Sequence, residues 1–178
     1  MDVGSTAKVD RGRSRKGKAV AIATVAGLLA GVVVTSIIGW TAMPEMMIVT
    51  EQSRLGFDET VSALVQAIGG QGWISPGTTD MQASLAKHGQ EFPHRVKIIT
   101  LCHPQYAADV LSTDRYVACL MPCSFAVWES DHGTVYVSKM NTGLIARMFG
   151  GNIAEVMGQK VARDEEAILA AVLNNSQR

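Results

Sequence analysis

The uncharged run AVAIATVAGLLAGVVVTSIIGWT, residues 19–41, divides the chain and decides how the rest of it is organised. It contains no Asp, Glu, Lys or Arg, and as a helix rising ~1.5 Å per residue it would be ~34 Å long. That length crosses a hydrocarbon core of ~30 Å. Because a buried helix of a soluble domain seldom stays apolar on every face for so long, the run predicts one transmembrane helix.

Charged residues are distributed unevenly around this run. Residues 1–18 carry six basic and two acidic side chains, so this tail has a net charge of +4 and the rest of the 178-residue chain has −4. The positive-inside rule places such a tail in the cytoplasm. We therefore expect a single-pass protein of the plasma (inner) membrane, with residues 46–178 forming one domain in the periplasm or outside the cell. A mildly acidic exported domain makes nucleic acid a poor partner, because that binding depends on neutralising phosphates.

A cleaved signal peptide is the alternative to a retained anchor. Signal peptides have apolar cores of ~7–15 residues that end in a small-x-small site. The present run is longer, and its exit candidate, Trp40-Thr41-Ala42, has a bulky residue where a small one is needed. We therefore expect the anchor to be retained, with residues 42–45 as a short linker to the domain.

Within the anchor, small residues recur at every fourth position. Gly27 and Gly31 form a small-xxx-small pair, which lets two helix backbones approach closely. The pattern predicts association with a second copy or with another membrane subunit, although Gly and Ala are also common in membrane helices without this role. The complete set is Ala23, Gly27, Gly31, Thr35 and Gly39.

After the linker, hydrophobic periodicity predicts strands and helices in alternation. An apolar stripe of Phe57, Val61, Leu64, Val65 and Ile68 indicates an amphipathic helix. Helices interspersed with strands joined by hairpins favour an α+β fold, an antiparallel sheet covered by helices on one face. The expected strands are 46–53, 73–74, 95–102, 116–121, 123–128 and 134–140, and the expected helices are 57–68, 79–87, 104–111, 142–149 and 152–173.

Two short motifs lie at the ends of expected strands and carry the chemistry of this chain. They are Cys102-His103-Pro104 and Met121-Pro122-Cys123. If the strands are neighbours, two thiols, an imidazole and a thioether converge, and such soft ligands suit Cu(I), Zn or haem iron. Cys102 also precedes a helix N-terminus, which favours a thiolate.

Other interpretations of these residues stay open. A disulfide between Cys102 and Cys123 is one alternative, since neighbouring cysteines often pair in an oxidising compartment, and inert core residues are another. Cys119 is expected in the core, and the acidic run Asp164-Glu165-Glu166 is expected to be solvated at the start of a helix. No catalytic motif of strong specificity is present, so enzymatic activity is not the favoured expectation.

The chain resembles domain-of-unknown-function family 302 over about residues 46–140. The resemblance rests on Phe57-Asp58-Glu59-Thr60-Val61, Gly72-Trp73, Cys102-x-Pro104 and Pro122-Cys123. It implies a TATA-binding-protein-like fold, β-α-β(4)-α in outline, and a tendency to form homodimers, but no established activity. The marked residues of the family correspond to Cys102, Pro104, Pro122 and Cys123. His103 departs from a frequent Asn, and Met140-Asn141 from a frequent Asp-Pro.

Three functions remain in consideration from the sequence. The first is a membrane-anchored binding or accessory domain that holds a soft ligand (copper, haem or a sulfur species) near Cys102, His103, Met121 and Cys123. The second is a structural or interaction subunit of a membrane complex without a ligand. The third is a thiol-disulfide redox protein, which the absence of Cys-x-x-Cys makes the least favoured.

Overall fold

The computed structural model describes residues 10–174, which belong to two compact units divided between Pro44 and Glu45. The predicted basic tail therefore lies partly outside the described residues, as do the last four residues of the predicted domain. The first unit consists of helix α1 (Asp10–Met47), which continues three residues past the division, and the second holds the sheet and all the other helices.

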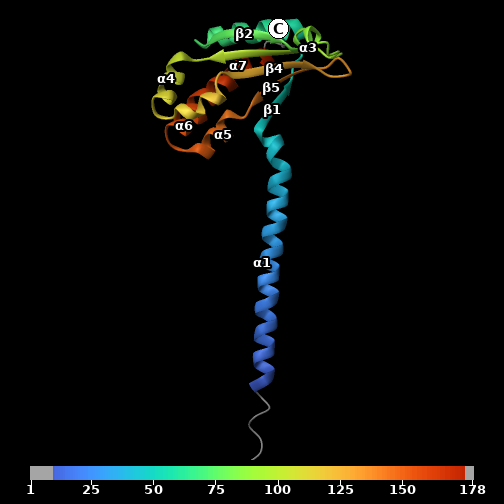
Figure 1. The fold of residues 1–178 in the computed structure, drawn as a ribbon, viewed down its shortest axis with the longest axis vertical. Coiled ribbons are helices and arrows are strands. Elements are labelled where there is room, and N and C mark those ends of the chain that lie inside the picture. The colour runs from blue at the N-terminus through green and yellow to red at the C-terminus, as the bar shows by residue number, and fades with distance from the viewer. Residues whose placement is uncertain (1–9, 175–178) are drawn as a thin grey trace, which may run out of the picture. The chain divides into compact units, whose positions relative to one another are not determined.

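Helix α1 contains the apolar run as one continuous helix (Figure 1). By length and composition alone, Ala23–Thr41 qualifies as a candidate membrane span, with a mean hydropathy of 1.9. The hydroxyl of Thr35 donates to the carbonyl of Gly31 at 2.8 Å, so this polar group is satisfied inside the helix. Residues 42–45, expected as a linker, are helical instead, and Pro44 lies inside the helix, three residues before its end at Met47.

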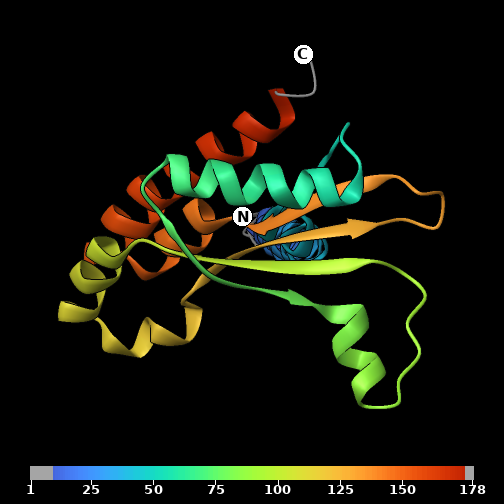
Figure 2. The same ribbon diagram turned by 90° about the horizontal axis from the view of Figure 1, so that it is seen from above.

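The second unit is an α+β domain built on an antiparallel sheet, as the sequence predicts, and this sheet has five strands (Figure 2). The spatial order is β1-β5-β4-β3-β2, so β1 and β2 form the two edges. Strands and helices follow the β-α-β(4)-α outline, with helices inserted between β2, β3 and β4. The strands are β1 (Ile48–Gln52), β2 (Ile74–Asp80), β3 (Val96–Cys102), β4 (Cys123–Glu129) and β5 (Val135–Met140).

Helices cover one face of this sheet. Figure 2 shows helix α2 (Phe57–Gly70) crossing the strands, and helix α7 (Ala162–Asn174) packs beside it. Side chains alternate along a strand, and in each central strand the middle residues of one phase are fully buried beneath these helices. That phase comprises Ile99 and Leu101 in β3, Phe125 and Val127 in β4, and Val137 in β5.

Helix α2 begins with a capping interaction, in which the Glu59 carboxylate accepts a hydrogen bond from the backbone N–H of Gly56 at 3.1 Å. Its buried side chains include Leu64 and Ile68, as predicted, but Val65 is 40% exposed. Thr60 is buried instead, because its hydroxyl pairs with that of Ser53 at 2.7 Å. The buried face of α2 therefore includes Thr60, whose hydroxyl is hydrogen-bonded, and not Val65, which the apolar periodicity had placed there.

The open face of the sheet carries the other phase of the strands. Trp128 stacks on Tyr136 with ring centroids 4.6 Å apart, and its Nε1 donates to Ser138 Oγ at 2.9 Å. The hydroxyls of Thr50 and Ser138 lie 2.8 Å apart. Mixed polar and aromatic cross-strand pairs of this kind suit a sheet face that α2 and α7 do not cover.

Several local predictions were wrong. Residues 116–121, expected as a strand, form the 3-10 helix η1 (Arg115–Leu120), because Val117 and Leu120 turn inward at a spacing of three. Helix α3 (Met81–Lys87) begins two residues later than the expected residue 79, and Asp80 caps it by accepting a hydrogen bond from Ala83 N at 2.9 Å through its Oδ1. Strand β2 is longer than the expected residues 73–74, and its pairing with β3 shifts register between Ile74 and Gly77.

The C-terminal helical region also differs from the single helix expected over residues 152–173. It consists of α6 (Gly151–Glu155), the π-helical segment η2 (Val156–Val161) and α7. A Cβ added to Gly158 would lie 3.4 Å from Ala146 Cβ, so η2 passes very close to helix α5 (Thr142–Phe149). The wider turn buries Val156, Met157, Gly158 and Val161 together, which an unbroken 3.6-residue period does not do.

Candidate functional site

The ends of β3 and β4 bring the two cysteine motifs together. Leu101 pairs with Cys123 in the register of these antiparallel strands, so Cys102 follows immediately beside it. Helix α4 (Pro104–Thr113) begins two residues later, with Pro104 in its first turn, where a missing N–H costs nothing. Both cysteines are free, so the disulfide alternative is not formed in this structure.

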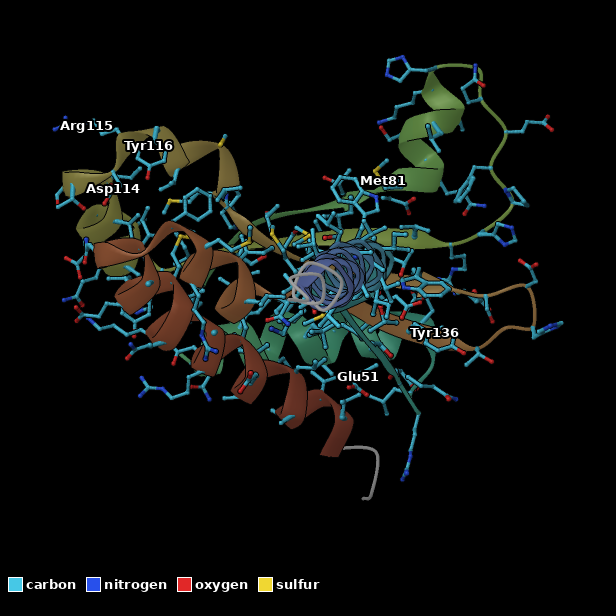
Figure 3. The ribbon with its side chains drawn as sticks, turned by 90° about the horizontal axis from the view of Figure 1, so that it is seen from below. Glu51, Met81, Asp114, Arg115, Tyr116 and Tyr136 are labelled. Carbon is cyan, nitrogen blue, oxygen red and sulfur yellow. The ribbon has the colours of Figure 1, made fainter. Side chains whose placement is uncertain are left out.

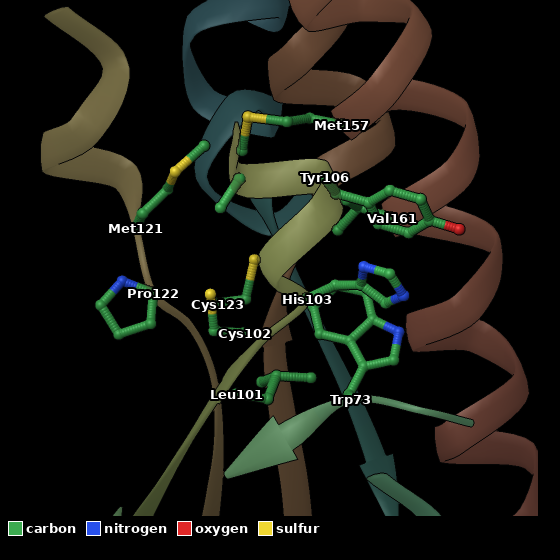
Figure 4. Close-up of a pocket in the computed structure, with 11 residues that line it drawn as sticks. Trp73, Leu101, Cys102, His103, Tyr106, Met121, Pro122, Cys123, Met157 and Val161 are labelled. Carbon is green, nitrogen blue, oxygen red and sulfur yellow. The ribbon is translucent and has the colours of Figure 1, made fainter. Parts of the chain in front are cut away.

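These residues line a small cavity, which we call the thiol pocket (Figure 4). Its volume is about 30 Å³, and its walls are almost wholly apolar apart from the sulfur and imidazole groups. The thiols of Cys102 and Cys123 lie next to each other in this view, with Met121 on one side and His103 on the other. The lining residues from the two motifs and η2 are Cys102, His103, Met121, Pro122, Cys123, Met157 and Val161.

His103 stands at the start of α4 but does not cap it with its side chain. Its ring stacks on Tyr106 with centroids 3.9 Å apart and meets Trp73 edge-on at 5.4 Å. Nδ1 of His103 is buried without a hydrogen-bond partner, which is a costly state for a polar atom. The imidazole therefore retains an unused hydrogen-bonding position, and its ring lines the pocket.

Aromatic side chains beside His103 are tied to helix α7. Trp73 Nε1 donates to Asp164 Oδ2 at 3.2 Å, so Asp164 is not simply solvated as expected. Burial, followed by the negative charge of Asp164, raises the pKa of Tyr106. These contacts fix the aromatic wall that holds His103 in place.

A buried ion pair lies on the other side of Cys123. Lys139 Nζ lies 3.2 Å from Glu165 Oε2, and the same oxygen accepts a hydrogen bond from Thr142 Oγ1 at 2.8 Å. The side chains of Lys139 and Glu165 are only 5% and 3% exposed. The expectation that Glu165 is solvated was therefore wrong, because the π-helical turn rotates it inward at the start of α7.

Burial and this ion pair together affect the protonation of Cys123. Burial raises the pKa of the Cys123 thiol, and the negative charge of the adjacent Glu165 carboxylate raises it further. Burial also raises the pKa of Glu165, although Lys139 and Thr142 oppose that shift. Cys123 is therefore a neutral thiol until something replaces its proton.

The structure thus gathers all four residues singled out by the motifs, Cys102, His103, Met121 and Cys123, around one cavity. It does not gather Cys119, which is exposed on η1 and not in the core as expected. Among the residues the structure describes, no group of three or more His, Cys, Asp or Glu side chains converges as a metal site. Any metal held here would need a methionine sulfur to complete its ligands.

Sequence reasoning missed Lys139, Thr142 and Glu165. The available signal was the alternation Val135, Val137, Lys139, which puts a lysine in the buried phase of β5. A lysine in that phase requires an anionic partner, but the partner lies 26 residues away in a helix.

The predicted association face of α1, from Ala23 to Gly39, is exposed along the helix. Its association with a second helix stays a prediction.

Comparison with known proteins identifies the domain but not its activity. No curated protein matches the chain. A crystal structure of an uncharacterized conserved DUF302 protein from Bacillus stearothermophilus is similar, with a TM-score of 0.65 and 22% identity, and the match covers 71% of this chain and 98% of that one. The family model described as "Domain of unknown function DUF302" matches residues 49–174, which extends past Met140 to include the C-terminal helices. The chain therefore belongs to the DUF302 family.

Proposed function

We propose that the domain binds one small soft cation, of the Cu(I) type, in the thiol pocket. Cys102 and Cys123 would supply thiolates, and Met121 or Met157 a thioether. The observation that supports this most strongly is the pocket itself, in which two free thiols and two methionines line one apolar cavity. Thiolate and thioether sulfur are the ligands that Cu(I) prefers.

The size of the cavity favours a bare ion over a larger ligand. About 30 Å³ accommodates roughly two water-sized spheres. Haem, which the sequence left open, is far larger than this, so it is the weakest of the ligands considered. A single sulfur atom bound as a persulfide is of suitable size and is the alternative ligand.

The type and number of ligands favour Cu(I) over a divalent ion. A Cu(I) ion that replaces the proton of the buried Cys123 thiol leaves the local charge unchanged. A second thiolate at Cys102 leaves one net negative charge, which a divalent ion would balance. Zn²⁺, however, takes four ligands in structural sites, and among the described residues no group of three or more His, Cys, Asp or Glu side chains could hold it.

We also infer that the domain works next to a membrane, facing the periplasm or the outside. This part of the proposal rests on the apolar run in α1 and on the basic tail that precedes it. Lipid is then the first partner, and a homodimer or another membrane subunit is the second. A Cβ added at Gly27 or Gly31 would meet nothing within 4 Å, so this face of the helix is open to a partner.

The copper proposal can be tested by titrating the reduced full chain in mild detergent with Cu(I) against a coloured chelator. We expect one ion per chain, and a loss of at least tenfold in affinity for Cys102→Ser and for Cys123→Ser. Cys119→Ser is the matched control, since that thiol is exposed and outside the pocket. No binding, or binding that survives in the double variant, would sink the proposal.

A purely structural role, without ligand, is the competing function. In that case, the cysteine variants would leave the chain unaffected, and detergent extraction would recover it with a stoichiometric membrane partner. Substituting Gly27 and Gly31 by Leu would release that partner, because the added side chains prevent close approach of the helices. The thiol-disulfide function is the third possibility, and it requires the Cys102 and Cys123 thiols to oxidise reversibly.

A further inference from the structure

A group of exposed apolar side chains lies where helices α5 and η1 meet. Tyr116, Met148 and Phe149 are 66%, 68% and 45% exposed, and the rings of Tyr116 and Phe149 lie 6.4 Å apart. Arg115 and Arg147 are exposed next to them in the chain. We call these five residues the α5–η1 patch; Figure 3 places Arg115 and Tyr116 at the rim of the domain, on the far side from Tyr136.

The patch is formed by the last turn of α5. Arg147, Met148 and Phe149 are successive residues, and Gly150 and Gly151 then reverse the chain with φ values of 71° and 53°. Only glycine adopts such backbone angles readily, so this turn leaves the end of the helix projecting. The cavity beneath Phe149 is only about 10 Å³, so the patch is a protruding surface and not a groove for a peptide.

The other end of α5 is tied to the chain that leaves the apolar run. Asn141, the N-cap of α5, donates from its side chain to Met46 O at 2.9 Å and from its backbone to Met47 O at 2.7 Å. Met46 is only five residues after Thr41, the last residue of the candidate span. Five residues reach at most ~18 Å even when fully extended, and an eight-residue helix adds ~12 Å.

We propose that the α5–η1 patch docks on the surface of an anionic lipid bilayer. Exposed Tyr, Met and Phe side chains flanked by arginines are typical of a surface that enters the headgroup region, where aromatic rings and apolar chains meet phosphate. The short connection keeps the patch within ~30 Å of the end of the span. This inference rests on the membrane placement proposed above, and it is independent of the copper site.

The tether also explains why a small patch is sufficient. A surface held this close to the bilayer has a high effective concentration of lipid around it. The patch can therefore stay bound through contacts that would be too weak to hold an untethered protein on the membrane. A second copy of the chain is the other conceivable occupant. A symmetric interface of this patch would bring both arginines of each copy to the same contact, and the repulsion among these like charges favours lipid.

The test is lipid photocrosslinking of the full chain in nanodiscs. Photoreactive p-benzoylphenylalanine replaces Phe149, or, as a control on another helix, Val65, which is also exposed and apolar. A third variant carries it in place of Trp40, within the candidate span. We expect lipid adducts at positions 149 and 40 and none at 65. Anionic lipid should increase the yield of lipid adducts at position 149. Replacing Arg115 and Arg147 with Gln should lower this increase about fivefold per arginine.

Each result separates docking from anchoring. Adducts at position 40 alone would overturn the docking and leave the anchor. Adducts at neither position would overturn both. Adducts at 149 that join two copies of the chain would show a protein interface in place of lipid and would equally overturn the proposal. Cu(I) titration of the same variants should be unchanged, because none of the substituted residues lines the thiol pocket.

Discussion

Two lysine–carboxylate pairs with the same geometry lie in very different surroundings. Lys97 Nζ is 3.2 Å from Asp58 Oδ1, and Lys139 Nζ is 3.2 Å from Glu165 Oε2. Both lysines occupy the covered phase of a central strand, β3 and β5 respectively. The first pair has side chains 26% and 66% exposed, whereas the second has side chains 5% and 3% exposed.

The difference lies in what covers each lysine. Lys97 lies at the start of β3, where Asp58 belongs to the exposed first turn of α2 and is shared with Arg95 at 2.6 Å. Lys139 lies at the end of β5, beneath the start of α7 and beside the thiol pocket. Water screens the first pair, so it contributes little. In the second pair neither charge can be hydrated, so Lys139 and Glu165 depend on each other and on the Thr142 hydroxyl for their polar contacts.

Replacing Lys139 with Met should therefore have the largest effect. It leaves Glu165 buried without its cation, which costs about 3–5 kcal/mol of unfolding free energy. Urea unfolding of the full chain in mild detergent, followed by tryptophan fluorescence, measures the loss. Lys97→Met is the matched control, with the same change at the same distance, and it should show no measurable loss. Equal losses of unfolding free energy in the two variants would contradict the claim that burial makes the Lys139 pair more important than the Lys97 pair.

Thr142→Val should come next. The substitution keeps the shape of the side chain but removes the hydroxyl that donates to Glu165 at 2.8 Å. A buried hydrogen bond to a charged group is worth about 2 kcal/mol, so the urea midpoint should fall accordingly. Thr100→Val removes a hydrogen bond of the same 2.8 Å length to Gly77 O at an exposed site and should cost clearly less. A reversed order would mean that Glu165 does not depend on this hydroxyl.

A smaller change is expected when both buried charges are removed together. Lys139→Met combined with Glu165→Met replaces the pair with two apolar side chains, which is often neutral. We expect the double variant to lie within about 1 kcal/mol of the unaltered chain, well above Lys139→Met alone. A double variant as unstable as the single one would show that Lys139 stabilises the domain by contacts other than the ion pair.

The pH dependence should differ in sign between the two pairs. Burial raises the pKa of Glu165 above its ordinary 4.5, so the folded chain holds a proton that the unfolded chain has lost. Stability should fall as the pH rises from 4.5 through that raised pKa, and Glu165→Gln should abolish the slope. This slope is the smallest effect in the series.

At Asp58 the sign is opposite. Hydrogen bonds from Arg95, then Lys97, hold the pKa of Asp58 below its ordinary 3.8. That contribution is present above pH 3.8 and is lost as the pH falls through the lowered pKa, so Asp58→Asn should flatten the acid limb alone. Urea midpoints across an acidic pH series measure both slopes, and slopes of one sign would contradict the difference in burial.

Much of the fold follows from local pattern. The alternation in residues 95–102, 123–128 and 134–140 marked three strands correctly, since a period of two leaves no ambiguity when one phase is strongly apolar. The segment 116–121 was misassigned because Val117 and Leu120 support a spacing of three as well as an extended chain. The candidate site was predictable in part, because both cysteine motifs end strands that proved to be neighbours.

Local sequence patterns predict the apolar run that sets α1 apart, the α+β class and the two motifs around Cys102 and Cys123. These are properties of short segments, in which hydrophobic period and turn residues suffice. The burial of Glu165 beside Lys139 and Cys123 emerges only from the packed fold. Burial of a carboxylate depends on which distant strand and helix meet, and on the π-helical turn that rotates it inward. No local pattern in an acidic run contains that information, because the energy that decides it arises only when the layers pack.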